Sequence, residues 1–345
     1  MATQAAGSTS NATLPQELID AMQALFGKHP GYRTTHAKGL LVEGVFTPTP
    51  DAQKLSVAAH FNSPSTPVVA RFSVGGGIPH IADVDVNATP KGIAIRFSVD
   101  ESTHTDLIAH SFNGFAAKNG EDFLAFLKIF REFGLAEAAL RKAQAGGGDT
   151  SKEQKHFDEV QAEFGAFLVN HPSAAAFVQG VKPNPYNFGT ITYYEPNTHV
   201  LTNKDGKVTN VRYRLDPQDG DHLYNNNDKD LIAQLGPNYL EDDIRSRFPL
   251  KPIVIFIRAH IANDDDVLDD ATIPYKSTEY IPVGTLVINK VADSGVYNDQ
   301  QIAFSPNPAT GGIKGIAPSD DPLIQTRKGV YKISWDQRKD AKQTE

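Results

Sequence analysis

Near its carboxyl end the chain reads PSDDPLIQTRKGVYKISWDQR over residues 318–338. Ser319, followed by two acids and Pro322, predicts the start of a helix, with a side-chain cap, negative charge in the first turn and an early proline. Four later positions share one face of this helix, because they are spaced by four, four and three residues. These positions are Arg327, Tyr331, Trp335 and Arg338. Such a mixture is unusual for a stripe that faces a protein core, so the helix is a candidate binding surface.

Tyr331 lies one turn after Arg327 and about two turns before Arg338. A free phenol ionises near pH 10, and a guanidinium about 4 Å from the oxygen stabilises the anion by about 4 kcal/mol at an effective dielectric near 20. A bound ferric ion would stabilise the anion further. The helix is therefore compatible with a tyrosinate ligand, although taken alone it favours a tyrosine packed between helix and sheet with arginines at the surface.

Composition excludes several classes of site. The chain has 345 residues, 40% of them hydrophobic and 21% charged, which is ordinary for a globular protein of one large domain or two small ones. A net charge of −8 without a long basic run argues against nucleic acid and anionic membranes as partners. The absence of cysteine excludes disulfides, iron–sulfur clusters, thiolate-ligated haem and cysteine zinc sites. It also fits a reducing compartment, so we expect a cytoplasmic location.

Residues 1–14 are small and polar and predict a disordered tail without a signal peptide. No stretch of 18 apolar residues predicts a membrane span. Thr13 and Pro15 predict the start of a short helix, and residues 120–180 read as helical with a break at 146–148. Alternating apolar residues predict strands at 39–46, 67–74, 90–98, 253–261 and 285–291, and in 186–216 around a turn at 203–206. The fold class is therefore α+β.

Two further segments carry polar residues at positions that need explaining. His36 stands at the entrance of the first strand, within Arg33-Thr34-Thr35-His36-Ala37, and a lone histidine there is more often structural than catalytic. Arg71 interrupts an apolar strand and needs a partner if it faces inward, such as a carboxylate held by both of its terminal nitrogens. The plainer alternatives are a surface salt bridge for Arg71 and a solvent-facing position for Ser73.

Three separated motifs resemble those of the haem catalases and occur in the same order. They are Arg-x-x-His-Ala at 33–37, Arg-Phe-Ser at 71–73 and Arg-x-x-x-Tyr at 327–331. The resemblance covers roughly residues 30–130 and 185–340. It implies an antiparallel β-barrel with surrounding helices, in a single haem domain of residues 15–345 with a helical insertion at about 120–180. The chain is too short for the extensions of large catalases and is similar to the short catalase-related peroxidases.

The resemblance also assigns roles. It makes Tyr331 the iron ligand of haem b, Arg327 the group bonded to its oxygen, and His36 the distal base with Ser73 on its far nitrogen. Haem-binding positions carried over in the same way are Arg33, Arg71 and Arg338 for the propionates, Phe123 for stacking on the distal face, and Trp335 where large catalases often have histidine. From the sequence alone, the pattern around Phe123 fits a core residue of the following helix as well as it fits a haem-stacking residue.

The sequence departs from the family pattern on the distal side. Catalases place an asparagine there that polarises the bound peroxide. Ungapped matching from Asp106 puts Ser111 at that position, with His110 just before it, whereas Asn113 would serve if the turn differs. Thr35 stands where large catalases usually carry valine and where catalase-like allene oxide synthases carry threonine.

The resemblance implies a peroxidase that reduces hydrogen peroxide or organic hydroperoxides with small organic donors, with at most weak catalase activity. His36 would move a proton from the near to the far peroxide oxygen. Two alternatives stay open at this point: a hydroperoxide dehydratase of the allene-oxide-synthase type, and a protein that binds or senses haem without turnover. The sequence leaves a homo-oligomer open as well.

Overall fold

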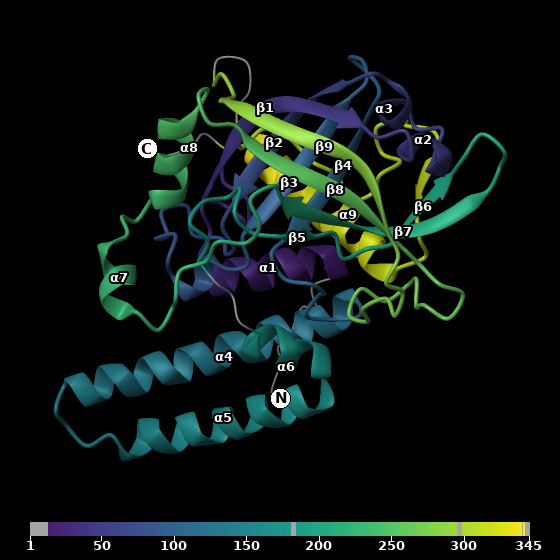
Figure 1. Ribbon diagram of the computed structural model, residues 1–345. Coiled ribbons are helices and arrows are strands. Elements are labelled where there is room, and N and C mark those ends of the chain that lie inside the picture. Colours follow the sequence, from purple (N-terminus) through teal and green to yellow (C-terminus); the bar gives the residue numbers. More distant parts are fainter. Residues whose placement is uncertain (1–12, 181–183, 295–298, 340, 342–345) are drawn as a thin grey trace.

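The computed structural model describes residues 13–180, 184–294, 299–339 and 341 (Figure 1). The tail predicted for residues 1–14 lies outside the described residues except for its last two. Helix α1 (Leu14–Phe26) begins where predicted and buries Leu18, Ile19 and Met22. Across the described ranges, none of the helices combines the length and the apolar character needed to cross a membrane.

Eight antiparallel strands close into a barrel, which confirms the predicted fold. The ring closes because β7 pairs with both β5 and β8, while β6 and β10 extend the sheet beyond β7. Around the ring the strands are β5 (Tyr193–Tyr194), β4 (His104–His110), β3 (Gly92–Ser98), β2 (Thr66–Ser73), β1 (Gly39–Pro48), β9 (Tyr280–Val291), β8 (Ile253–Ile261) and β7 (Val208–Pro217). The extension comprises β6 (His199–Thr202) and β10 (Ile316–Pro318). The turn predicted at 203–206 joins β6 to β7.

Side chains alternate between the two faces of the barrel wall. Val68, Ala70 and Phe72 of β2 belong to the apolar core inside the barrel. Arg71 and Ser73, between and after them, therefore face outward. The same alternation applies to β4, where Leu107 and Ala109 are in the core and His110 faces outward. The polar residues singled out in the sequence thus lie on the outer face of the wall.

Register fixes which of these outward positions are neighbours. Gly39 pairs with Ser73, Ser73 with Gly92, and Gly92 with His110. Directly paired residues project to the same face with their Cβ atoms about 5 Å apart. Gly39, Ser73, Gly92 and His110 therefore form one row across the ends of four strands, which we call the outer row.

The segment at 299–305 covers this outer face. Phe304 packs against Leu41 and Val69 of the wall. The Ser305 amide donates to Asp106 Oδ2 over 2.7 Å, and Asp106 also forms a 2.7 Å ion pair with Arg96. These contacts fix the segment against β3 and β4, and they leave the barrel interior to apolar packing.

In the view of Figure 1 the helices built from residues 120–179 lie below the barrel, whereas shorter helices lie at its upper left and upper right. Residues 120–179 form α4 (Gly120–Ala145), α5 (Ser151–Asn170) and α6 (Pro172–Gln179), in the region predicted to be helical. Figure 1 shows the α4–α5 pair extending away from the barrel. Helix α1 packs between α4 and α9 (Pro322–Lys339), with Leu18 and Ile19 against Leu124 and Val330. The shorter helices are α2 (Ala52–Leu55), α3 (Ala59–Asn62), α7 (Lys229–Gln234), α8 (Tyr239–Arg247) and the 3₁₀ turn Val86–Ala88.

Helix α9 begins at Pro322, as predicted, but the capping residue differs from the prediction. The Leu323 amide donates to Asp321 Oδ1 over 2.8 Å, so Asp321 caps the first turn. Asp321 Oδ2 also accepts a 2.8 Å hydrogen bond from Asn197. Ser319 was the wrong choice, because the helix begins three residues after it and its hydroxyl accepts only a long 3.4 Å bond from the Asp321 amide.

Candidate active site

His36 is held in an unusual backbone conformation just before β1. Its φ is +53°, and it is the one non-glycine residue with positive φ in the described part of the chain. Such a conformation costs about 1 kcal/mol or more for a residue with a side chain. Arg71 offsets part of that cost by donating to the carbonyl oxygen of His36 over 2.9 Å, and His36 Nδ1 lies 3.0 Å from Ser73 Oγ. One hydrogen bond therefore holds the backbone of His36 and another holds its ring.

The absence of a side chain at Gly92 leaves room for the His36 ring. A Cβ atom at position 92 would lie 2.9 Å from Ser73 Oγ and 3.0 Å from His36 Nδ1. The imidazole therefore rests on the backbone of the outer row, between Ser73 and His110.

A Gly92→Ala substitution is expected to displace the His36–Ser73 pair and to destabilise the protein by about 1–3 kcal/mol, because the pair cannot move without losing its hydrogen bond. Thermal unfolding and the rate of reaction with peroxide measure the two effects. Gly134→Ala is the matched control: its Cβ meets nothing within 4 Å, so on helix α4 it should stabilise slightly. Equal behaviour of the two variants would contradict the packing described for His36.

Burial and surrounding cations keep His36 neutral. Burial is the main cause that lowers its pKa, to about 4, and the guanidinium groups of Arg71, Arg33 and Arg327 lower the pKa further. At neutral pH the imidazole therefore carries one proton and has one nitrogen free to accept another. This is the state that a general base needs.

Three arginines lie around one carboxylate beside His36: Arg71 and Arg338 are buried, and Arg33 is partly buried. Asp299 lies 2.6 Å from Arg71 Nε and 3.7 Å from Arg33 Nη1. Arg338 Nε donates to the carbonyl oxygen of Gln300 over 2.6 Å, and its pKa is lowered to about 10, first by burial and then by Arg71, while Asp299 acts to raise it. These four groups together carry three positive charges and one negative charge. We call them the arginine cluster.

Arg327 and Tyr331 lie together on α9. The guanidinium carbon is 5.7 Å from the centre of the Tyr331 ring. Arg327 also bonds Asn197 Oδ1 and lies 3.7 Å from the buried carboxylate of Glu195. Burial acts to lower the pKa of Arg327, but Tyr331 and Glu195 outweigh it and raise the pKa above its usual value. The cation next to Tyr331 is therefore permanent.

Contacts between distant segments bring these parts together. Thr34 Oγ1 lies 3.4 Å from Ser334 Oγ, which joins the His36 loop to α9 next to Tyr331. Trp335 Nε1 donates to the carbonyl oxygen of Gln301 over 3.0 Å, and Gln301 donates back to the Arg338 carbonyl oxygen over 3.0 Å. The structure thus assembles the His36 loop, the outer face of the barrel and α9 into one site.

Other predicted residues lie at the edge of this site or away from it. Ser111 Oγ accepts a 3.0 Å hydrogen bond from the Lys91 amide, which uses the hydroxyl to close the end of the β3–β4 pair. Asn113 is exposed to solvent. Phe123 lies in the first turn of α4 with its ring 5.2 Å from Phe115, and Thr35 directly precedes His36 and is half-buried. Ser111 and Asn113 both follow the end of β4, and their distal roles stay predictions.

Sequence reasoning missed several residues of the site. Asp299 is separated from Arg71 by 228 positions, and no local pattern marks it. Glu195 and Asn197 lie beside β5, on the partner strand of β4, where Glu195 Oε2 accepts from the Ile108 amide over 3.0 Å. His110 was noted only as the residue before Ser111. The registers of β2 with β3 and of β3 with β4 are needed to identify it, because together they show that His110 shares a row with Ser73.

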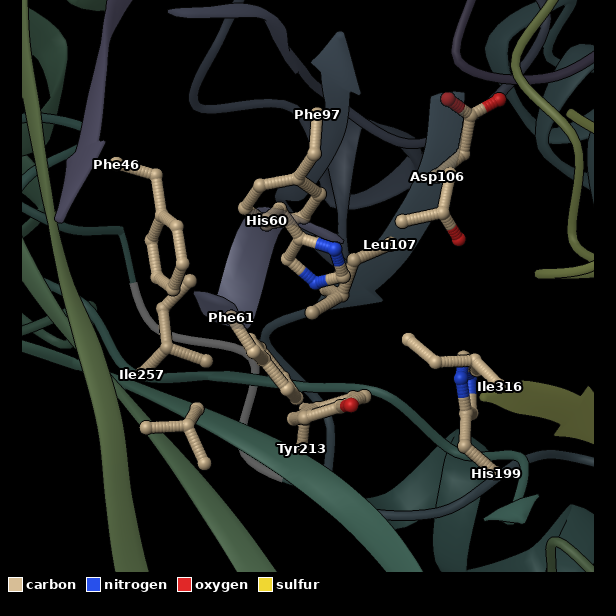
Figure 2. Close-up of a pocket in the computed structure, with 12 residues that line it drawn as sticks. Phe46, His60, Phe61, Phe97, Asp106, Leu107, His199, Tyr213, Ile257 and Ile316 are labelled. Carbon is tan, nitrogen blue, oxygen red and sulfur yellow. The ribbon is translucent and has the colours of Figure 1, made fainter. Parts of the chain in front are cut away.

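The barrel interior holds a separate small cavity (Figure 2). Its volume is about 20 Å³, which is room for about one water molecule. Figure 2 shows His60 near Phe97 and Phe61, with His199 and Ile316 across the cavity. The His60 ring centre is 4.3 Å from that of Phe61, and its Nδ1 has no hydrogen-bond partner among the described residues. No residue of the candidate site lines this cavity.

Three histidines should make the protein sensitive to acid. Burial is the leading cause that lowers the pKa of His36 to about 4 and those of His60 and His110 to about 3. Between pH 6.5 and these values the unfolded chain binds protons that the folded chain does not, so the free energy of unfolding falls as pH falls. From pH 7 to pH 5 the loss should be on the order of 5 kcal/mol for the three sites together.

Thermal unfolding of the purified protein at pH 7, 6 and 5 measures this loss. His60→Phe lies away from the candidate site and should remove about one third of the pH dependence. Unchanged pH dependence in this variant would show that His60 does not titrate in this way.

Comparisons with known proteins agree with this geometry. The sequence matches the family description "Catalase" over residues 2–343. It is 29% identical over 328 residues to a catalase-related peroxidase of Mycolicibacterium paratuberculosis, covering 94% of this chain and 95% of that protein. It is 26% identical over 334 residues to a catalase-related peroxidase of Synechococcus elongatus, covering 96% and 91%. These relatives share nearly the full length of the chain.

Larger relatives share only part of their length. A catalase isozyme A of Oryza sativa subsp. indica is 25% identical over 313 residues, which cover 87% of this chain and 58% of that protein. A fungal catalase structure matches with a TM-score of 0.71 at 20% identity, covering 98% of this chain and 65% of its own. Catalase A from Saccharomyces cerevisiae matches with a TM-score of 0.70 at 20% identity, covering 98% and 67%. The structural matches support the fold.

Proposed function

The chain belongs to the catalase family, and we propose that it is a haem-dependent peroxidase that reduces hydrogen peroxide or organic hydroperoxides with small organic donors. The observation that carries this proposal is the joining of the His36–Ser73 pair to the Arg327–Tyr331 pair through the Thr34–Ser334 contact. The near full-length match to two catalase-related peroxidases supports the same reading.

The residues of the site fit a haem group. In the arginine cluster, two buried guanidinium groups and one partly buried one lie near a single carboxylate, which leaves two positive charges in excess among these four groups. An unmatched buried cation is costly unless it gains an anionic partner. Haem b has two propionates, and arginine suits bidentate binding of carboxylates. Charge and donor type therefore both fit a group with two carboxylates at this place.

Helix α9 carries the proposed iron ligand. Tyr331 would bind the metal through its phenol oxygen, beside the permanent positive charge of Arg327, whose guanidinium carbon lies 5.7 Å from the centre of the Tyr331 ring. Arg33, Arg71 and Arg338 would hold the propionates, with Phe123 and Trp335 at the rim of the site. When bound, haem would supply the electrons that break the peroxide O–O bond.

His36 would act first as a general base and then as a general acid. Because its Nδ1 faces Ser73 Oγ, the Nε2 atom is free to take the proton from the near peroxide oxygen. The Nδ1–H group would then donate to Ser73 and hold the ring while Nε2 returns the proton to the far oxygen. Water or an alcohol leaves, according to the peroxide used. Thr35 would restrain the same imidazole if its hydroxyl bonds the ring.

We extend the proposal to the organisation of the chain. Residues 15–345 would form a single haem-binding domain with residues 120–180 as a helical insertion, and haem b would be the form bound. The partners would be peroxide and a small organic donor, in the cytoplasm.

A visible absorption spectrum tests the proposal. We expect the haem-loaded protein to change its spectrum on mixing with a peracid, and a phenolic donor to restore the original spectrum while being oxidised. A spectrum unchanged by peracid would contradict the proposal and indicate haem storage or sensing. Conversion of a fatty-acid hydroperoxide without consumption of donor would contradict it in favour of a dehydratase.

A further inference from the structure

His110 faces the same space as the His36–Ser73 pair. It ends strand β4 in the outer row, where Gly92 separates it from Ser73. Because position 92 has no side chain, and its Cβ would meet the His36 ring at 3.0 Å, the His36 imidazole lies over the gap between Ser73 and His110. The two imidazoles are therefore near neighbours above one strip of backbone.

Burial and neighbouring cationic or ionisable groups determine the protonation state of His110. Burial is the main cause that lowers its pKa, to about 3, followed by His36 and then by Arg327 of α9. The Phe112 amide, which donates to Nδ1, acts in the opposite direction. His110 is consequently neutral at neutral pH.

A hydrogen bond determines where His110 carries its single proton. The Phe112 amide donates to His110 Nδ1 over 3.3 Å. An amide N–H can only donate, so Nδ1 is the unprotonated nitrogen and Nε2 bears the hydrogen. In the described part of the chain no hydrogen bond to Nε2 is formed. His110 thus offers a fixed N–H donor.

Aromatic contacts hold the ring in this orientation. Its centre lies 6.4 Å from that of Phe112 at an interplanar angle of 16°, and 6.5 Å from that of Phe115. Phe115 in turn packs 5.2 Å from Phe123 on α4. The neighbouring candidates differ from His110, because Ser111 Oγ accepts from the Lys91 amide while its rotatable O–H is not fixed in direction, and Asn113 is exposed.

We propose that His110 is a substrate-binding residue of this site, which donates a hydrogen bond from Nε2 to the oxygen of a bound peroxide. The inference rests on the proposed function. His36 then exchanges protons with the peroxide, while His110 fixes its position without changing its own protonation. The ligand class is a small acceptor such as a peroxide oxygen or a halide anion.

The first test needs no haem. In protein labelled with ¹⁵N-histidine, two-bond ¹H–¹⁵N spectra report the tautomer of each imidazole, and His110→Asn identifies the signal of residue 110. We expect a neutral ring with hydrogen on Nε2 at pH 7. Hydrogen on Nδ1, or a protonated ring at pH 7, would overturn the inference.

The second test uses fluoride as the probe with haem-loaded protein. We expect His110→Leu to weaken fluoride binding and to slow the reaction with peracid, each by about tenfold, because one hydrogen bond is lost. His110→Asn keeps a neutral N–H donor and should stay within about threefold of the unmodified protein. His104→Leu, at the other end of β4, is the matched control and should change neither quantity.

The outcomes separate the two proposals. If the unmodified protein reacts with peracid and His110→Leu matches it in both quantities, the inference about His110 fails while the proposed function stands. If the unmodified protein does not react at all, the proposed function fails, and the tautomer spectrum alone decides whether His110 is a donor. If His110→Leu does not fold, comparison of His110→Asn with the unmodified protein and the tautomer spectrum decide the matter.

Discussion

Replacing Tyr331 with phenylalanine is expected to abolish stable haem binding. The substitution removes one oxygen and leaves the ring that packs beside Arg327. Loss of groups that merely orient a metal ligand typically costs 10–100-fold in affinity, so loss of the ligand itself should cost at least about 100-fold. Titration of the apoprotein with haem, followed by absorbance, measures the affinity, and the spectrum of any bound haem reports the ligand.

Tyr186→Phe is the matched control for this experiment. Tyr186 is about half exposed and lies in the loop before β5, away from α9. The Tyr186→Phe variant should bind haem with the affinity of the unmodified protein. A Tyr331→Phe variant that kept both the affinity and the spectrum of the unmodified protein would remove Tyr331 as the metal ligand, and with it the proposed arrangement of the site.

Replacing His36 with alanine is expected to slow the reaction with peroxide by about 10²–10⁴-fold, the range for loss of a general acid–base group. Haem binding should be retained, because the arginine cluster and Tyr331 are unchanged. Rapid mixing of haem-loaded protein with a peracid measures the rate constant. In the unmodified protein the rate should fall as pH falls through about 4, where His36 becomes protonated and can no longer accept a proton.

His80→Ala provides the control, because His80 is an exposed histidine outside the site. It should react at the rate of the unmodified protein. If His36→Ala reacts as fast as His80→Ala, the general-base role of His36 is wrong. If both variants are slow, the protein is sensitive to any loss of histidine, and the assignment to His36 would also fail.

Local patterns in the sequence were sufficient for most of the fold. The apolar spacing of Leu18, Ile19 and Met22 correctly predicted α1, and the alternation around Arg71 correctly predicted β2. Helix α9 was predicted from Pro322 and the two acidic residues before it. The sequence did not show whether Ser319 or Asp321 caps the helix, because that depends on the residue at which the helix begins. Asp321 also accepts from Asn197, which lies far away in the sequence, and no local rule contains that contact.

The site was harder to predict than the fold because its residues meet through register and long-range pairing. Family motifs led to His36, Ser73 and Tyr331 and gave Ser111 and Asn113 as distal candidates. His110 became a candidate only through the register of β2, β3 and β4. Adjacent residues of a strand project to opposite faces, so the sequence alone does not show which of two neighbours faces a site. Asp299 is the clearest case, since its identity as a site residue depends wholly on Arg71 and Arg33, at the other end of the chain.

The assembly of the site from the His36 loop and α9 has a consequence for biosynthesis. During translation the barrel strands and the distal histidine leave the ribosome well before Tyr331 does. A nascent chain can therefore complete the barrel before Tyr331, the proposed haem ligand, has been synthesised. Capture of the prosthetic group is then a late event in maturation, coupled to the docking of α9, and a chain that stops before α9 should keep a barrel and remain colourless.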